Sequence, residues 1–170
     1  MFPPDTVVLS HHSEYRQAAN DPAKNSFVRS IFLGYSPPRH LDLVEILTRA
    51  DTEIQRLAKM CGAFTINVEF GFLRKNTSDD IQFDDETLIP RGLRLVGIVP
   101  IIRNFVCFDD EGFDTSSPAY TQTQKGIMHY KTNQQKNNYY ALDAARIDQF
   151  GISSDGKVWL IDADPILSVK

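Results

Sequence analysis

The spacing of apolar residues changes at Gly62, and this change limits the folds open to the chain more than any other feature. Before Gly62, apolar residues recur at alternating intervals of four and three, which is the spacing of one helix face. After it, apolar and polar residues alternate from Phe64 to Leu73, as on a half-buried strand with an aromatic inner face. The sequence therefore predicts a helix over Leu41–Cys61 and a strand directly after it. The helical stripe consists of Leu43, Leu47, Ala50, Ile54, Leu57 and Cys61.

The ends of this helix carry suitable residues. Asp42 and Glu45 fall in its first turn, where acidic side chains stabilise the helix dipole. Gly62 is placed for a left-handed cap at its C-terminal end. A stripe of this length fits a helix lying on a sheet and also fits a coiled-coil seam, and we favour the sheet.

Two further segments are predicted to join the sheet. Leu93–Phe108 is apolar on both faces and is interrupted by Pro100, which indicates two strand segments in a central part of the sheet. Asp155-Gly156 separates two short apolar runs near the end of the chain, which is typical of a hairpin. The expected fold class is therefore α+β, with a mainly antiparallel sheet and one long helix packed on it.

The chain of 170 residues has the length of one domain. Its first part, about residues 1–36, is predicted to be an irregular arm with a short helix at Ser13–Ala19 and a strand at Phe27–Leu33. Residues Asp109–Asn138 are polar and are predicted to form a long loop that orders on a partner. A short helix is expected over Asn138–Asp148.

Charge and composition exclude several classes of protein. A net charge of -4 argues against a chain-wide nucleic-acid surface, so a nucleic-acid partner is not expected. The longest apolar run, Val96–Ile102, is too short to cross a membrane, and the first residues do not resemble a signal peptide. The sequence thus predicts an intracellular, cytoplasmic protein. Cys61 and Cys107 are expected to be buried free thiols, and the histidines show no zinc-ligand spacing with them.

Asp162 and Asp164 end the second hairpin strand and would project from the same face of it. The segment Leu142–Asp164 resembles the catalytic loop and metal-binding hairpin of protein-kinase-like phosphotransferases. It is most similar to the short, divergent kinase-like domains of phages and mobile elements. The final Leu-Ile-Asp is also similar to the closing strand of ATP-grasp enzymes, in which case Asp164 stands where an asparagine ligand is usual.

The kinase-like resemblance implies positions for the remaining site residues. In such families a base is followed after five residues by a metal-binding asparagine, and after thirteen more by a metal-binding aspartate. Counting back from Asp162 places Gln149 at the asparagine and Ala144 at the base. The resemblance thus implies a metal set of Asp162, Asp164 and Gln149 and no catalytic residue. If the resemblance is set aside, Asp162 and Asp164 are expected to be solvated acids at a strand end.

Two functions from different classes follow. The first is a non-catalytic protein-binding or assembly module without a cofactor, whose partner is another protein or a second copy of the chain. The second is a degenerate kinase-like or ATP-grasp-like protein that binds ATP and Mg²⁺. Candidate interface anchors for the first are the aromatic residues Tyr120, Tyr130, Tyr139, Tyr140 and Trp159.

Overall fold

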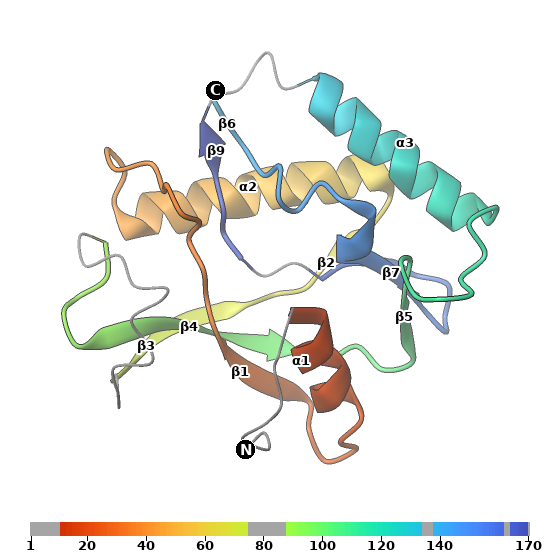
Figure 1. Cartoon of the computed structure of the whole chain (residues 1–170), viewed down its shortest axis with the longest axis horizontal. Helices are drawn as coiled ribbons and strands as arrows, with labels where there is room; N and C mark the ends of the chain where they lie inside the picture. The colour runs from red at the N-terminus through yellow and green to blue at the C-terminus, as the bar shows by residue number, and fades with distance from the viewer. Residues whose placement is uncertain (1–10, 75–87, 134–137, 162–163, 170) are drawn as a thin grey trace.

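The computed structural model of the chain describes residues 11–74, 88–133, 138–161 and 164–169 (Figure 1). Its elements form three small sheets, with helices packed against them. In chain order they are α1 (His11–Ala19), β1 (Ser26–Ser30), α2 (Leu43–Cys61), β2 (Phe64–Thr65), β3 (Glu69–Arg74), β4 (Leu93–Pro100), β5 (Phe105–Cys107), α3 (Pro118–Thr132), β6 (Tyr139–Tyr140), the 3-10 helix η3 (Ile147–Gln149), β7 (Phe150–Ser153), β8 (Val158–Leu160) and β9 (Ser168–Val169).

The first sheet has the strand order β1-β4-β3 and is antiparallel throughout. Its central strand, β4, was predicted to be central, and the chain leaves the sheet after Pro100, where a break was expected. Leu95 and Val99 of β4 are buried in a first hydrophobic cluster together with Ile31, which follows β1. This sheet therefore supplies one wall of the core.

The second sheet has the order β2-β8-β7-β5. Only the β2–β8 pairing is parallel, while β7 pairs antiparallel with both β8 and β5. The β7–β8 hairpin confirms the sequence prediction. Its turn is closed by the Gly156 N–H on the Ser153 carbonyl and by the Ser153 N–H on the Lys157 carbonyl. Gly156 supplies the one positive φ, +82°, that a type I turn followed by a left-handed residue requires.

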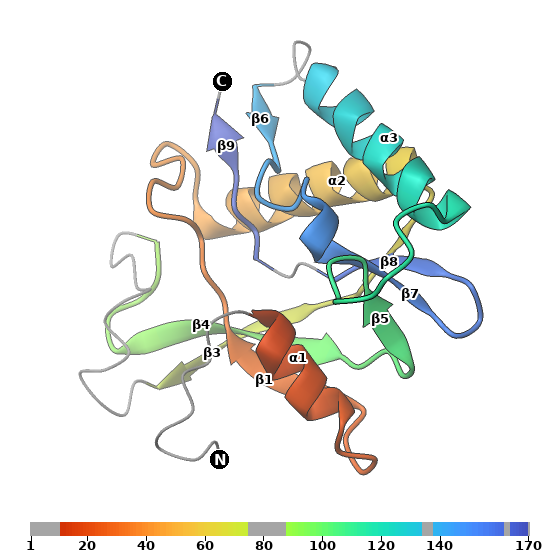
Figure 2. The ribbon, with the colours of Figure 1, turned by 45° about the vertical axis from the view of Figure 1, so that its right-hand side comes forward.

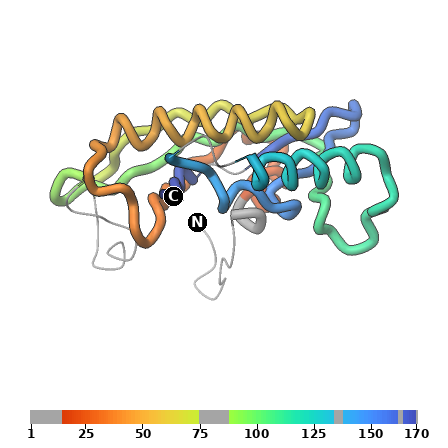
Figure 3. Tube along the Cα trace, turned by 90° about the horizontal axis from the view of Figure 1, so that it is seen from above, coloured from red at the N-terminus to blue at the C-terminus, as the bar shows by residue number. Residues whose placement is uncertain are grey.

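The predicted long helix is α2, and its ends are capped as the sequence indicated. Asp42 and Glu45 form a reciprocal capping box, and Gly62 adopts the left-handed conformation at the other end. Figure 3 shows α2 running along the length of the molecule, with α3 beside its C-terminal part. The protein is thus α+β, with one long helix packed on sheets that are rich in antiparallel pairs, as predicted.

The face that α2 buries is rotated slightly from the predicted stripe. Leu43, Leu47 and Ile54 are only partly buried at the margins of the hydrophobic clusters. The fully buried positions are Ile46, Ala50, Glu53, Leu57, Ala58 and Cys61. Ile46 and Ala50 belong to the first cluster, whereas Leu57 belongs to a second cluster with Phe150 and Leu160. One helix thus contributes to both clusters.

The prediction of one strand over residues 64–73 with a buried aromatic face was wrong. The chain forms two strands in different sheets, β2 and β3, and between them Ile66 is buried. Phe64, Phe70 and Phe72 are 52%, 38% and 43% exposed. Among the described residues, β3 lies at the edge of its sheet and pairs with a strand on one side only.

The prediction of a long polar loop over 109–138 was also wrong, because α3 spans Pro118–Thr132. Ser117 caps its N-terminus and Pro118 begins its first turn, which is a favoured helix start. Its buried face consists of Thr123, Gly126, Ile127 and Tyr130, and it packs against α2. The helix expected over 138–148 is likewise absent, and β6 and η3 lie in this region instead.

Within the predicted irregular arm, the described residues from His11 onward form regular structure, and residues 1–10 lie outside the described residues. The short helix and the strand expected there are α1 and β1, and β1 pairs along its whole length with β4. Figure 2 shows α1 lying in front of β1 and the end of β4. Cys61 and Cys107 are buried free thiols, as predicted. Within the described ranges, every helix is too short or too polar to span a membrane.

Candidate functional site

An arginine of the first sheet meets an acid that follows the terminal hairpin. Arg29 lies on β1, and its Nη2 lies 3.1 and 3.0 Å from the two carboxylate oxygens of Asp164. The Phe32 N–H donates to Oδ1 of the same carboxylate at 3.1 Å. Both side chains are almost entirely buried, with 9% of Arg29 and 13% of Asp164 exposed. This contact joins segments that are 135 residues apart.

Asp164 was expected to be solvated at a strand end, and this expectation was wrong. Burial raises the pKa of Asp164 above its ordinary value of 3.8, while Arg29 and the Phe32 N–H oppose the rise. The nearby charge of Asp143 adds a smaller upward shift to the same pKa. The cost of removing the carboxylate from water is therefore only partly offset by its partners. Asp162, the other predicted metal ligand, lies outside the described residues.

A second group of charges lies on the segment between β6 and β7. Arg146 contacts Asp148 through Nε at 3.0 Å and Asp143 through Nη1 at 3.5 Å. These three side chains are partly exposed to solvent. Because Asp143 also acts on the pKa of Asp164, the two groups of charges belong to one region of the molecule. We call Arg29, Asp143, Arg146, Asp148 and Asp164 the charged cluster.

The residues reached by counting back from Asp162 do not belong to this charged cluster. Ala144 is buried in the second hydrophobic cluster, and Gln149 is 3% exposed. The two acids that contact Arg146 each lie one residue before a counted position: Asp143 precedes Ala144, and Asp148 precedes Gln149. Sequence reasoning missed them, although they have the same five-residue separation that the kinase-like pattern requires.

The backbone of Gln149 nevertheless forms a hydrogen bond with Ile161, which follows β8 and directly precedes Asp162. Its carbonyl accepts the Ile161 N–H at 3.0 Å, and its own N–H donates to the Arg146 carbonyl at 3.1 Å. Its side-chain oxygen is buried without a hydrogen-bond partner among the described residues. The structure thus places Gln149 beside Ile161 by its backbone, and buries its amide instead of presenting it to solvent.

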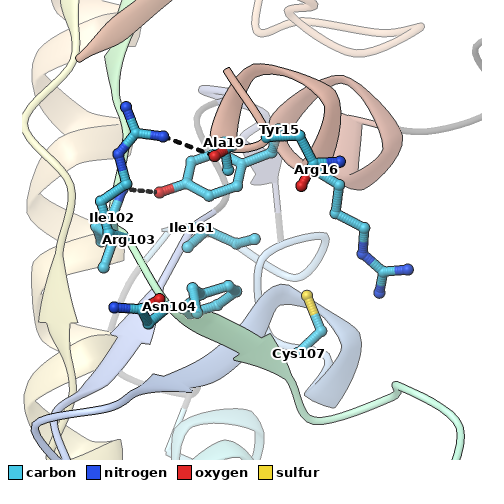
Figure 4. Close-up of a pocket in the computed structure, with 10 residues that line it drawn as sticks. Tyr15, Arg16, Ala19, Ile102, Arg103, Asn104, Cys107 and Ile161 are labelled. Atoms are coloured by element: carbon cyan, nitrogen blue, oxygen red, sulfur yellow. Dashed lines mark hydrogen bonds between the residues drawn. The ribbon is translucent and has the colours of Figure 1, made fainter. Parts of the chain in front are cut away.

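Ile161 also lines a pocket of about 330 Å³ between α1 and the β4–β5 connection (Figure 4). One wall is formed by Tyr15, Arg16, Ala19 and Asn20 of α1 and its end. The opposite wall is formed by residues 102–105, where Asn104 adopts a left-handed conformation with φ of 54°. Because Ile161 directly precedes Asp162, the pocket and the acidic segment are adjacent parts of the chain.

Cys107, which lines the pocket, belongs to a small group of potential metal ligands. The Sγ of Cys107 and carboxylate oxygens of Asp109 and Asp110 lie within 4.8 Å of one another. Asp110 is already bound to Arg16 and to the Cys107 N–H. Burial raises the pKa of Cys107 to about 11, so its thiol is protonated at neutral pH and is a poor ligand. We do not assign a metal to this group.

The aromatic residues predicted to be interface anchors have partners within the chain. Tyr120 packs against Phe108, and Tyr140 donates to the Val169 carbonyl. The guanidinium of Arg49 lies 4.8 Å from the centre of the Tyr139 ring. The Trp159 indole N–H donates to Ser153 Oγ at 3.0 Å, and its ring lies 5.3 Å from that of Phe64.

Tyr130 is fully buried and cannot serve as an interface anchor in this structure. Its hydroxyl donates to Glu53 of α2 at 2.7 Å and accepts the Ala141 N–H at 2.7 Å. Arg56 completes the network by binding Glu53 at 2.8 Å and covering the Tyr130 ring. This network joins α2 and α3 to the start of the segment that carries Asp143.

Comparison with known proteins gives no relative for this chain, since no family model, no curated protein and no solved structure matches it.

Proposed function

We propose that the chain binds a magnesium complex of a nucleoside polyphosphate at the charged cluster. The observation that carries the proposal is the contact between Arg29 on β1 and Asp164 after the β7–β8 hairpin. In kinase-like phosphotransferases, a cation on a strand before a long helix and an aspartate after a hairpin converge on the nucleotide phosphates and their metal. Here β1 precedes α2, and Asp164 follows β8, in the same order along the chain.

Arg29 has the chemistry that a phosphate group requires. Its guanidinium is planar and permanently charged, and such groups bind carboxylates and phosphates through the same paired hydrogen bonds. Because Arg29 is held inside the protein by Asp164, its position is fixed before a ligand arrives. An arginine arranged in this way supports binding of an anion at the charged cluster.

The donor set also fits magnesium. Mg²⁺ prefers oxygen ligands and is usually held by one or two carboxylates together with substrate phosphates. Asp148 and Asp164 would hold it in this protein, together with Asp162, which directly follows Ile161 in sequence. The ion would neutralise charge on the phosphates. The side-chain oxygen of Gln149 is not counted among the magnesium ligands, because this side chain is buried in the interior.

The proposal concerns binding first. Ala144 is buried and has no proton acceptor, and the neighbouring Asp143 is engaged by Arg146. If phosphate is transferred, Asp143 is the carboxylate that would accept the proton of a substrate hydroxyl, since it is partly exposed beside Asp148.

The assembly-module hypothesis receives less support. It was based on a long unstructured segment and on free aromatic anchors. The segment contains α3, Tyr130 is buried, and the other four aromatic side chains contact residues of the same chain.

Thermal unfolding with defined ligands tests the proposal. A ligand at a hundred times its dissociation constant stabilises the native state by about 2.7 kcal/mol, so Mg-ATP should raise the melting temperature measurably. ATP with a chelator and Mg²⁺ alone should each have a smaller effect. Arg29→Lys and Asp162→Asn should reduce the response, whereas Arg39→Lys, at an exposed position, should not.

No response of the wild type to Mg-ATP would exclude the proposal. An equal rise in melting temperature with ATP in the presence and absence of magnesium would exclude a magnesium ion from the proposed complex. Incubation with labelled ATP and a general protein substrate then tests transfer separately, and Asp143→Asn is the variant expected to remove it.

A further inference from the structure

A tyrosine of α1 is bound to the β4–β5 connection as an aromatic ligand would be. The Tyr15 hydroxyl accepts a hydrogen bond from the backbone N–H of Ile102 (Figure 4). Its ring meets Phe27 and Phe105 edge to face, with ring centres 5.9 Å apart in both cases. The side chain is 3% exposed, and burial raises the pKa of Tyr15 to about 12. Tyr15 is therefore a neutral aromatic group in an aromatic slot.

The slot has the features of a site for a planar ring. Two aromatic side chains form its walls, and a backbone N–H points into it from residue 102. Aromatic walls with one directed polar group are typical of small-molecule sites. The pocket of about 330 Å³ is lined by both Tyr15 and Ile161, and Asp148 of the charged cluster acts electrostatically on another of its lining residues, Cys107.

Tyr15 is brought into the slot by a helix that side chains hold in place. Arg103 donates to the Ala19 carbonyl at 2.6 Å and to the Asp21 carbonyl at 3.1 Å, which anchors the C-terminal end of α1. Arg16, which lines the pocket, forms an ion pair with Asp110, and 55% of the Arg16 side chain is exposed. An exposed pair of this kind contributes little to stability, so this attachment of α1 is weak.

We infer that Tyr15 is an internal occupant of the slot that receives the base of the nucleotide, and that α1 must withdraw it before a nucleotide binds in full. This inference rests on the proposed function. The ligand class it names is a planar heteroaromatic ring with a hydrogen-bond acceptor at its edge, because that acceptor replaces the Tyr15 hydroxyl on the Ile102 N–H. The charged cluster then binds the phosphates of the same molecule.

Two probes test the two ends of the ligand separately. Adenosine has the base without phosphates, and magnesium tripolyphosphate has the phosphates without a base. In the wild type, only molecules in which Tyr15 has left the slot can bind adenosine, and the apparent affinity is reduced in proportion to their fraction. Tyr15→Ala should therefore bind adenosine at least about tenfold more tightly than the wild type. Its affinity for magnesium tripolyphosphate should stay within about twofold of the wild type. Tyr35→Ala, at a side chain that is 91% exposed, is the matched control and should leave both affinities unchanged.

A rescue experiment reports on the slot itself. Cavities left by removing an apolar ring bind small aromatic molecules. Phenol should therefore raise the melting temperature of Tyr15→Ala and leave those of the wild type and Tyr35→Ala unchanged. If Tyr15→Ala does not fold, Arg103→Met is used instead, because it releases the end of α1 and keeps the ring. That variant should also bind adenosine more tightly than the wild type.

The possible outcomes separate this inference from the proposed function. Equal adenosine affinity in the wild type, Tyr15→Ala and Arg103→Met would overturn the inference, even if magnesium tripolyphosphate binds. Tighter adenosine binding by the variants without any binding of magnesium tripolyphosphate would support the slot and overturn the proposed function. Binding of neither probe by any variant would overturn both.

Discussion

Gly126 of α3 lies directly against the backbone of Cys61 in α2. A Cβ atom added at Gly126 would fall 2.6 Å from the Cys61 Cα and 2.6 Å from the Met60 carbonyl oxygen. Both obstacles are backbone atoms and cannot rotate away, so the two helices can cross this closely only because residue 126 has no side chain.

Gly126→Ala should therefore destabilise the protein, although alanine has the higher helix propensity. Overpacking of this kind costs about 1–3 kcal/mol, which urea unfolding can resolve. Gly71→Ala is the control, because an added Cβ there meets no atom within 4 Å, and its effect should stay within about 0.5 kcal/mol. Equal stability of Gly126→Ala and the wild type would show that α3 can shift away from α2 without loss.

The buried Arg29–Asp164 pair should behave as a unit in mutagenesis. Asp164→Leu removes the carboxylate that faces the buried Arg29 guanidinium and should cost about 3 kcal/mol. The double variant Arg29→Met/Asp164→Leu should lose less free energy of unfolding than Asp164→Leu alone. Replacing both members of a buried ion pair by apolar residues often costs little stability. Asp51→Leu, at an exposed acid on α2, should change stability by less than about 0.5 kcal/mol. Additive effects of the two single changes would show that Arg29 and Asp164 are not coupled.

The raised pKa of Asp164 predicts a pH dependence of definite sign. An acid with a folded-state pKa above its unfolded value of 3.8 binds more protons in the native state. Its contribution to stability is therefore greatest in acid and falls as pH rises through the raised pKa, above which it is constant. The free energy of unfolding of the wild type relative to Arg29→Met/Asp164→Leu should fall as the pH rises above the unfolded-state pKa of 3.8. A rise instead would mean that Arg29 and the Phe32 N–H outweigh burial and that the pKa of Asp164 is lowered in the native state.

Tyr130→Phe should be costly because both hydrogen bonds of the hydroxyl are buried. Without it, Glu53 loses a donor at 2.7 Å and the Ala141 N–H loses its acceptor. The expected loss is about 2 kcal/mol in the free energy of unfolding. The same change at Tyr120, whose hydroxyl accepts an exposed bond from Gln124, should cost less than about 0.5 kcal/mol. A loss at Tyr130 no larger than at Tyr120 would show that water replaces the missing hydroxyl.

Features specified by nearby residues could be predicted from the sequence. The capping box of α2 depends on Asp42 and Glu45, and the hairpin turn depends on Gly156, so each is encoded within a few positions. The break after Pro100 was visible for the same reason. Such elements follow from local backbone preferences, which a single sequence displays directly.

α3 was missed because its buried face contains few apolar side chains. Thr123 and Gly126 are fully enclosed, but neither contributes to an apolar periodicity. The helix packs through close approach of its backbone to α2, and small residues favour such an approach without raising hydrophobicity. The start signal Ser117-Pro118 is present, but no apolar periodicity follows it to mark a helix.

The candidate site could be predicted only in part because its contacts are distant in sequence. Nothing near Arg29 indicates that it meets Asp164, 135 residues later. Asp143 and Asp148 were passed over because the count from Asp162 assumed a fixed hairpin length, and Asp148 lies fourteen residues before Asp162. The five-residue spacing between Asp143 and Asp148 was the better indicator of the site acids, because it does not depend on the length of the β7–β8 hairpin.

The sharing of α2 between the two hydrophobic clusters has a consequence for dissection of the protein. Cutting the chain after β4 would leave the second sheet without Leu57 and Cys61, and removing the residues up to α2 would take Ile31 from the first cluster. Neither sheet could then be produced as an autonomous fragment with a complete interior. Two fragments cut between β4 and β5 should regain native structure only when mixed, because α2 must pack against both partners at once.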